Sequence, residues 1–161
     1  DCVSLEEYKI AGLGEKNCET QYKTRFETLI NILNDNNNEK IQVIPYIIVN
    51  NLEEVMEEYS FFVMSSRNEG FGLVLAEAQA KGLPTISFDC KTGPNEIINN
   101  EKDGLLVESG NIEKLSDAII KMIEKGEERV EMSKNAVENS KRFSIDKICT
   151  EWKQLFENIE K

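Results

Sequence analysis

The stretch FFVMSSRNEGFGLVLAEAQAKGLPTISFDC, residues 61–90, contains the elements that decide the fold. It begins with the apolar run 61–66, passes through a glycine-containing turn, and continues into the Ala- and Leu-rich segment 72–82. A second apolar run follows at 84–90. The pattern predicts a strand, a helix that closes at Gly82, and another strand, because glycine is the preferred residue just past a helix end. Strands joined by helices in this way are the repeating unit of α/β proteins.

The same alternation continues on both sides of this unit. Further strands are predicted at residues 8–14, 41–49 and 104–108. Further helices are predicted over about 19–34, from Pro94, from Asn111 to a break near Gly126, beyond that break, and after Ser144. This spacing places helices on both faces of parallel strands. With right-handed crossovers, the prediction is an α/β fold with a doubly wound, Rossmann-like, mostly parallel sheet.

The composition is that of a globular domain without nucleic-acid-binding character. The chain has 161 residues, of which 40% are hydrophobic and 30% charged, enough for one domain with a core. A net charge of −11, with no offsetting Lys/Arg cluster, argues against a nucleic-acid surface. No apolar run approaches the roughly 20 residues of a transmembrane helix. There is no signal peptide, so we expect a cytoplasmic location.

Metal binding is not predicted. The chain has no histidine, and its cysteines lie far apart without C-x-x-C pairs: Cys2, Cys18, Cys90 and Cys149. Protein zinc sites are built from sets of Cys and His ligands, so reduced, packed thiols are the expected state of these side chains.

The turn before the central helix is a candidate anion site. Open parallel sheets bind ligands at the carboxyl ends of their strands, where this turn is expected. The first N–H groups of a helix are unpaired and carry the positive end of its dipole, so they favour an anion such as a diphosphate. Gly70 and Gly72 would let a ligand approach the backbone closely. An ordinary tight turn would contain the same residues, so both interpretations stay open at this point.

Glu77 stands within the apolar helix, which we expect to be buried nearly all round. An unpaired carboxylate there would cost several kcal/mol. One explanation is a surface ion pair with Lys81 at i,i+4, worth about 0.2–0.5 kcal/mol. The other is a ribose, whose vicinal hydroxyls match the two carboxylate oxygens. Glu69, beside the anion site, would also be expected to meet hydroxyls, and a sugar on each side of a diphosphate describes a nucleotide sugar.

Residues 65–107 closely resemble a known family. The segment SSRNEGFGLVLAEAQAKGLPTISFD, followed by TGPNEII and DGLLV, is similar to the C-terminal, donor-binding half of the family 4 retaining glycosyltransferases of GT-B fold. The E-x7-E signature of that family stands at Glu69 and Glu77. The resemblance runs from YKIAGLG at 8–14 to the C-terminal helix. It is strongest with bacterial members that build capsule, lipopolysaccharide or lipid-linked oligosaccharide.

The resemblance implies a role for each matched residue. Glu69, the candidate catalytic residue, would contact the donor hexose, and Glu77 would hold the ribose. Backbone N–H groups would hold the sugar and the phosphates at Gly70, Phe71, Gly72, Leu73 and Val74. The base would lie against Tyr46 and Ile47.

The resemblance also implies the reaction and its partners. A hexose would pass from a nucleotide sugar, most simply UDP-hexose or UDP-N-acetylhexosamine, to a glycan or lipid-linked acceptor with retention of anomeric configuration. The leaving diphosphate would take the acceptor's proton, and neither a metal nor another cofactor would be needed. Two alternatives from other classes stay open. One is a non-catalytic nucleotide-sugar-binding subunit that works with a separate acceptor-binding chain, and the other is a GT-B-like nucleotide-sugar epimerase.

Two features of the family pattern are missing. Members precede the 8–14 strand with a strand and helix that carry an Arg and a Lys for the diphosphate, and Arg67 and Lys91 are the candidates for a partial substitute. The acceptor-binding N-terminal half is also missing. Residues 1–161 are therefore interpreted as the donor-binding fragment of a longer protein, inactive alone. Peripheral contact with the inner face of the plasma membrane could come through the missing half. Because the missing strand would be central, we expect an interrupted or locally repaired sheet.

The terminal helix, 144–161, carries an apolar face at helical spacing: Ile145, Ile148, Trp152, Leu155, Phe156 and Ile159. Packing of this face on its own domain is the favoured interpretation. In the family that the sequence resembles, the last helix instead reaches back to the N-terminal half.

Overall fold

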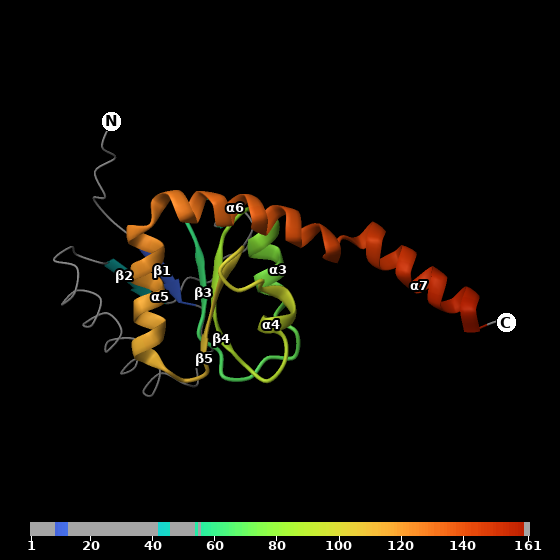
Figure 1. Ribbon diagram of the computed structural model, residues 1–161, viewed down its shortest axis with the longest axis horizontal. Coiled ribbons are helices and arrows are strands. Elements are labelled where there is room, and N and C mark those ends of the chain that lie inside the picture. The colour runs from blue at the N-terminus through green and yellow to red at the C-terminus, as the bar shows by residue number, and fades with distance from the viewer. Residues whose placement is uncertain (1–8, 13–41, 46–53, 55, 160–161) are drawn as a thin grey trace.

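A computed structural model describes residues 9–12, 42–45, 54 and 56–159, and its elements confirm an α/β fold (Figure 1). In chain order they are β1 (Lys9–Gly12), β2 (Gln42–Pro45), β3 (Phe62–Met64), α3 (Leu73–Ala80), β4 (Thr85–Asp89), α4 (Pro94–Ile97), β5 (Gly104–Glu108), α5 (Ile112–Glu124), α6 (Gly126–Ser140), the 3₁₀ turn η1 (Lys141–Phe143) and α7 (Ile145–Ile159). The helix predicted over 19–34 lies outside the described residues.

The strands are parallel but fall into two sheets. β1 pairs with β2, and a separate sheet has the order β3-β4-β5. Among the described strands none joins the two sheets, in agreement with the expected interruption. β2 ends at Pro45, which has no N–H to donate to a ladder.

Helices cover both faces of the three-stranded sheet. α5 packs on one face, α3 and α4 lie on the other, and α6 crosses one end and contacts both α3 and α5 (Figure 1). Side chains of a strand alternate between its faces. Accordingly Ile86 and Phe88 of β4 join the hydrophobic core under α5, whereas the buried Thr85 and Ser87 point the other way.

The helix boundaries follow local signals in the sequence. Gly82 has a φ of +77°, its N–H donates to the Gln79 carbonyl, and the Leu83 N–H donates to the Ala78 carbonyl at 2.9 Å. These two bonds form a Schellman motif, which confirms the predicted helix end. Pro94 opens α4 as predicted, and the Asn111 side chain caps α5 by accepting from the Lys114 N–H at 3.0 Å.

A buried polar network ties α3 to the end of the sheet where β4 and β5 begin. Gln79 donates to Asp103 at 3.0 Å, and Asp103 also accepts from the backbone and side-chain N–H groups of Asn99, both at 2.8 Å. Asn139 of α6 donates to Gln79 at 3.1 Å. Burial raises the pKa of Asp103 above its ordinary value, although the hydrogen bonds from Asn99 and Gln79 oppose that shift. The network fixes α3 from the end opposite to the candidate site.

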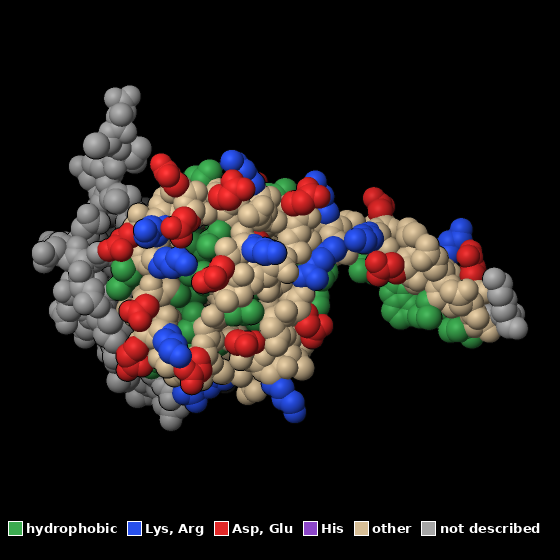
Figure 2. Space-filling model, in the orientation of Figure 1, with side chains coloured by type: hydrophobic (Ala, Val, Ile, Leu, Met, Phe, Trp, Pro, Cys, Tyr) green, Lys and Arg blue, Asp and Glu red, His purple; other side chains and the backbone are tan. Residues whose placement is uncertain are grey.

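α7 does not pack on its own domain, so that interpretation of the terminal helix is wrong. The helix extends away from the body of the molecule, and hydrophobic side chains line one side of it (Figures 1 and 2). None of its residues is buried, and Trp152 is 55% exposed. The reason is geometric: η1 turns the chain outward after α6, and α7 begins at Ile145 beyond the end of the core. Within the described part of the chain, no helix has the length and apolar character needed to cross a membrane.

Candidate functional site

The carboxyl ends of β3 and β4 bring two loops side by side. The Cys90 thiol, at the end of β4, donates to the Ser66 carbonyl at 2.9 Å. The Thr92 hydroxyl donates to the Glu69 carbonyl at 2.7 Å. Side chains of the loop after β4 therefore hold the backbone of the turn that carries the predicted site residues. This is the edge where parallel sheets bind ligands.

Gly93 brings the two loops into contact at a third point. A Cβ at Gly93 would lie 2.5 Å from the carbonyl oxygen of Phe71, closer than any side chain tolerates. Its φ of +96° also lies in the region that favours glycine. Only glycine therefore allows the loop after β4 to approach the Phe71 backbone this closely.

The start of α3 has the features predicted for an anion site. Gly72 precedes the helix with φ +86° and ψ +49°, and no side chain caps the first turn. The Leu75 N–H donates to the Gly72 carbonyl at 2.8 Å, so the N–H groups of Leu73 and Val74 precede the first bond of the helix. Space beside Gly70 is open, since no atom lies within 4 Å of a Cβ built there.

The two glutamates lie in different surroundings. Glu69 is half-buried, whereas Glu77 is exposed one helical turn after the start of α3. Among the described residues no cation lies within ion-pair distance of Glu77, and Lys81 pairs with Glu57 at 3.1 Å. The surface pair between Glu77 and Lys81 is therefore not the arrangement seen. The Glu77 side chain is exposed on α3, the helix that begins at the candidate anion site.

The expectation that α3 is buried nearly all round is wrong. One face packs inward, with Leu75, Ala76, Ala78 and Gln79 buried, but Leu73 is 67% exposed and shares the outer face with Glu77 and Ala80. The sheet and α6 cover only one side of the helix, so the carboxylate of Glu77 is not desolvated by the protein itself. An exposed Glu77 carries no cost of burial, so its predicted role rests on its position in α3 and on the family signature.

The pKa of the Cys90 thiol reflects the negative charges at this edge of the sheet. Cys90 is only 2% exposed, and burial, followed by the nearby charges of Glu69 and Asp89, raises the pKa of its thiol. The carboxylate of Glu69 is thus close enough to Cys90 to disfavour a second negative charge. The thiol is reduced and packed as expected, whereas Cys149 is free but exposed on α7, contrary to the expectation of packed thiols.

The structure gives less information about the residues predicted to contact the base and the diphosphate. Tyr46 and Ile47, predicted to contact the base, lie outside the described residues. Arg67 and Lys91, the candidates for a diphosphate-neutralising pair, are both exposed on the two loops. Among the described residues no group of three or more His, Cys, Asp or Glu side chains could hold a metal ion. Binding without a metal stays a prediction.

Two residues that lie beside the site, Arg142 and Phe143, were not predicted from the sequence. Phe143 of η1 packs edge to face on Phe71, with ring centroids 5.5 Å apart and an interplanar angle of 82°. Arg142 lies over the Phe143 ring and donates to the carbonyls of Glu96 and Ile97. The available signal was a single aromatic residue in the polar stretch NSKRFS, between two predicted helices.

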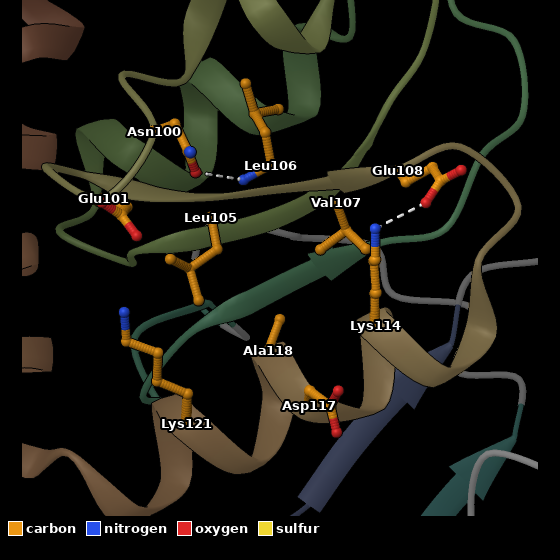
Figure 3. A pocket seen from close by; sticks show the side chains of 10 residues that line it. All are labelled: Asn100, Glu101, Leu105, Leu106, Val107, Glu108, Lys114, Asp117, Ala118 and Lys121. Carbon is orange, nitrogen blue, oxygen red and sulfur yellow. Dashed lines mark hydrogen bonds and ion pairs between the residues drawn. The ribbon is translucent and has the colours of Figure 1, made fainter.

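A surface hollow lies elsewhere, between β5 and α5 (Figure 3). An ion pair of 2.8 Å between Lys114 and Glu108 borders it, and the Asn100 side chain accepts from the Leu106 N–H at 2.8 Å. None of the predicted site residues lines this hollow. Because neither its position nor its lining residues match the predicted site, we place the candidate site at the carboxyl ends of β3 and β4 instead.

Known proteins resemble this chain in sequence and in structure. The chain is 31% identical over 105 residues to the poly(ribitol-phosphate) alpha-N-acetylglucosaminyltransferase of Staphylococcus aureus. This alignment covers 65% of this chain and 21% of that protein. The superposition on a crystal structure of TarM covers 93% of this chain and 28% of the TarM chain, with 26% identity and a TM-score of 0.67. The structure of Anabaena Alr3699/HepE in complex with UDP matches 98% of this chain and 42% of its own, with 18% identity and a TM-score of 0.73, and so shows the fold.

The curated relatives are longer than this chain, which spans from 10% to 40% of their length. The structural neighbours are glycosyltransferases of GT-B fold, and a parallel sheet flanked by helices is one Rossmann-like half of that fold. The family model described as glycosyl transferases group 1 matches residues 7–139. The match includes both loops of the candidate site and all of α3. The chain belongs to the glycosyl transferases group 1 family.

Proposed function

We propose that this chain is the C-terminal, donor-binding half of a family 4 retaining glycosyltransferase. Within a longer protein it would transfer a hexose or N-acetylhexosamine from a UDP-sugar to a glycan or lipid-linked acceptor. One observation carries the proposal: an uncapped helix start at Gly72 stands at the carboxyl ends of β3 and β4, with Glu69 just before it and the exposed Glu77 one turn after it.

The geometry supports a division of roles along the turn. The N–H groups at the start of α3 favour the diphosphate, because they are unpaired and lie at the positive end of the helix dipole. Glu69 lies before the helix, where the hexose would be, and Glu77 lies after its first turn, where the ribose would be. Both carboxylates would accept hydrogen bonds from hydroxyl groups, which are charge-assisted and therefore strong.

The chemistry requires little of this half beyond holding the donor. The bond between the anomeric carbon and the diphosphate oxygen breaks, a bond to the acceptor oxygen forms on the same face, and the acceptor's proton passes to the leaving phosphate. Glu69 would orient the hexose during this exchange. No cofactor is part of the proposal. The acceptor would be held by a further domain, and we propose a cytoplasmic site of action with peripheral membrane contact through that domain.

The named relatives support the choice of donor. The Staphylococcus aureus relative is an N-acetylglucosaminyltransferase, and the Anabaena structure of the same fold binds UDP. Both facts favour a uridine nucleotide and a hexose or N-acetylhexosamine for this chain. We propose polysaccharide or cell-surface glycan synthesis as the process that uses the product.

The test is a panel of nucleotide sugars and free nucleotides titrated into the chain by calorimetry, with and without a chelator. UDP-sugars should bind more tightly than GDP- or ADP-sugars, and chelator should not change the affinity. Affinity that disappears with chelator and returns with Mg²⁺ would contradict binding by a helix start. Absence of binding to every member of the panel would contradict the donor-binding function itself.

A further inference from the structure

The short turn η1 connects the C-terminal part of the chain to the candidate site. It lies between α6 and α7, far from the site loop in sequence. Arg142 donates from its guanidinium to the carbonyls of Glu96 and Ile97, the latter at 2.9 Å. These carbonyls close α4, where cationic donors are favourable. η1 is thereby fixed to α4, whose first residue follows the second loop of the site.

Phe143 extends this attachment to the first loop of the site. The guanidinium carbon of Arg142 lies 4.3 Å from the centroid of the Phe143 ring, which restrains the ring from one side. The ring contacts Phe71 edge to face at 5.5 Å between centroids. Both rings pack on the hydrophobic cluster between α3 and the sheet, formed by Met64, Leu75, Ala76, Ile97 and Ile98.

Phe71 is the side chain by which the middle of the site turn is attached to the body. Its neighbours Gly70 and Gly72 have no side chains, and nothing lies within 4 Å of a Cβ built at Gly70. The Phe71 backbone is in turn in contact with Gly93. The position of the turn over the start of α3 therefore depends on where the Phe71 ring is held.

We propose that Phe143 is a positioning residue for the donor site: through Phe71 it holds the turn Glu69–Gly72 in the conformation that accepts a nucleotide diphosphate. The identity of the ligand rests on the proposed function. The effect of Phe143 on the conformation of the turn does not depend on it. If the competent fraction of the turn falls to between a third and a tenth without the aromatic contact, the apparent Kd rises about 3- to 10-fold. An edge-to-face contact between two aromatic rings is strong enough to produce a change of this size.

The decisive variants alter the ring and leave the apolar volume largely intact. Phe143→Leu removes the edge-to-face contact, Phe143→Tyr restores it, and Phe143→Met is the second variant in case Phe143→Leu does not fold. Phe156→Leu is the matched control, because Phe156 lies in an aromatic pair with Trp152, centroids 5.7 Å apart, on exposed α7 away from the site. Each variant is first checked by circular dichroism to be folded at the temperature of measurement.

Two measurements follow on the whole chain. One is the Kd for UDP by calorimetry, and the other is hydrogen exchange, without ligand, of the Leu75 amide, which donates to the Gly72 carbonyl at 2.8 Å. The expected result is 3- to 10-fold weaker UDP binding and faster exchange for Phe143→Leu, with wild-type values for Phe143→Tyr and Phe156→Leu. Unchanged UDP affinity in the folded Phe143→Leu or Phe143→Met variant would overturn the proposal. If wild type binds no UDP, the proposed function fails, and the exchange rates alone decide the role of Phe143: unchanged exchange overturns it.

Discussion

The Thr92 hydroxyl donates a 2.7 Å hydrogen bond to the Glu69 carbonyl, so the loop after β4 holds the backbone of the residue predicted to contact the donor sugar. We expect Thr92→Val to weaken UDP-sugar binding. The variant keeps the shape and removes the donor, and a hydrogen bond of this kind contributes about 0.5–1.5 kcal/mol, or roughly two- to tenfold in Kd. The measurement is calorimetric titration with a UDP-sugar.

The matched control for that experiment is Thr150→Val. Thr150 makes the same kind of bond, to the Asp146 carbonyl at 2.7 Å, but within α7. Its replacement should leave binding unchanged. Equal effects of the two substitutions would show that the Thr92 bond has no special connection to the site.

We expect Glu77→Gln to weaken binding of UDP-type ligands while the free energy of unfolding changes little. Glu77 is exposed, so the fold does not depend on its charge. If it accepts charge-assisted hydrogen bonds from ribose hydroxyls, their loss costs roughly 1.5–3 kcal/mol of binding. A 2′-deoxy nucleotide sugar should bind wild type more weakly and the variant about equally. Glu113→Gln, at another exposed glutamate near a helix start, is the control. A similar loss for the deoxy ligand in wild type and in Glu77→Gln would refute the ribose role.

The proximity of Glu69 to Cys90 predicts a pH effect that needs no ligand. Burial, and then the charges of Glu69 and Asp89, raise the pKa of the Cys90 thiol. Removing one of these charges with Glu69→Gln lowers the cost of forming the thiolate, so the pKa should fall. Alkylation of Cys90, followed site by site by mass spectrometry, should then begin at lower pH in the variant. The exposed Cys149 provides an internal reference whose profile should not move. An unchanged Cys90 profile would mean that the Glu69 side chain points away from the thiol.

The buried network around Asp103 predicts a pH-dependent effect on stability. The folded-state pKa of Asp103 is raised above its ordinary value of 3.8, so the folded state binds a proton more tightly than the unfolded state does. This contribution to stability is complete below pH 3.8 and is lost as the pH rises through the raised pKa. In Asp103→Asn the titration is absent, and a buried donor left unpaired costs about 1–3 kcal/mol.

The difference in unfolding free energy between wild type and Asp103→Asn should therefore be largest at low pH and shrink as the pH rises. Urea unfolding at a series of pH values measures it. UDP affinity of the folded variant should be unchanged, because the network lies at the opposite end of the strands. A difference that grows with pH would contradict the raised pKa.

Local signals made much of this fold predictable. Gly82, Pro94 and Asn111 each end or begin a helix for a reason that lies within a few residues of sequence. The helix start at Gly72 was predictable for the same reason. Contacts between distant segments were not: nothing near Phe143 or Thr92 in the sequence indicates that they meet Phe71 and Glu69.

Amphipathic patterns also left the direction of packing undetermined. The apolar face of α7 has the spacing of a core helix, yet in the structure it is exposed. The spacing of apolar residues shows that one face of a helix is hydrophobic, but it does not identify the surface on which that face packs. The same holds for α3, whose Ala- and Leu-rich sequence suggested burial on every side although Leu73 and Glu77 face outward.

The last prediction is that this chain alone does not transfer sugar. Retaining transfer requires the acceptor hydroxyl to be held near the anomeric carbon, and such positioning can supply about 7–11 kcal/mol of the barrier. In the GT-B arrangement the acceptor lies on the opposite domain, and this chain spans 10% to 40% of the length of the curated relatives compared with it. Arg67 and Lys91 are exposed on the site loops, and if they do not replace the family's Arg and Lys, two lost charge-assisted contacts cost roughly 3–6 kcal/mol. The test supplies a UDP-sugar and crude lipid or glycan acceptors to this chain and to a longer protein with an upstream GT-B half restored. Comparable turnover by both would contradict the assignment of acceptor binding to another domain, because residues of this chain would then have to hold both substrates.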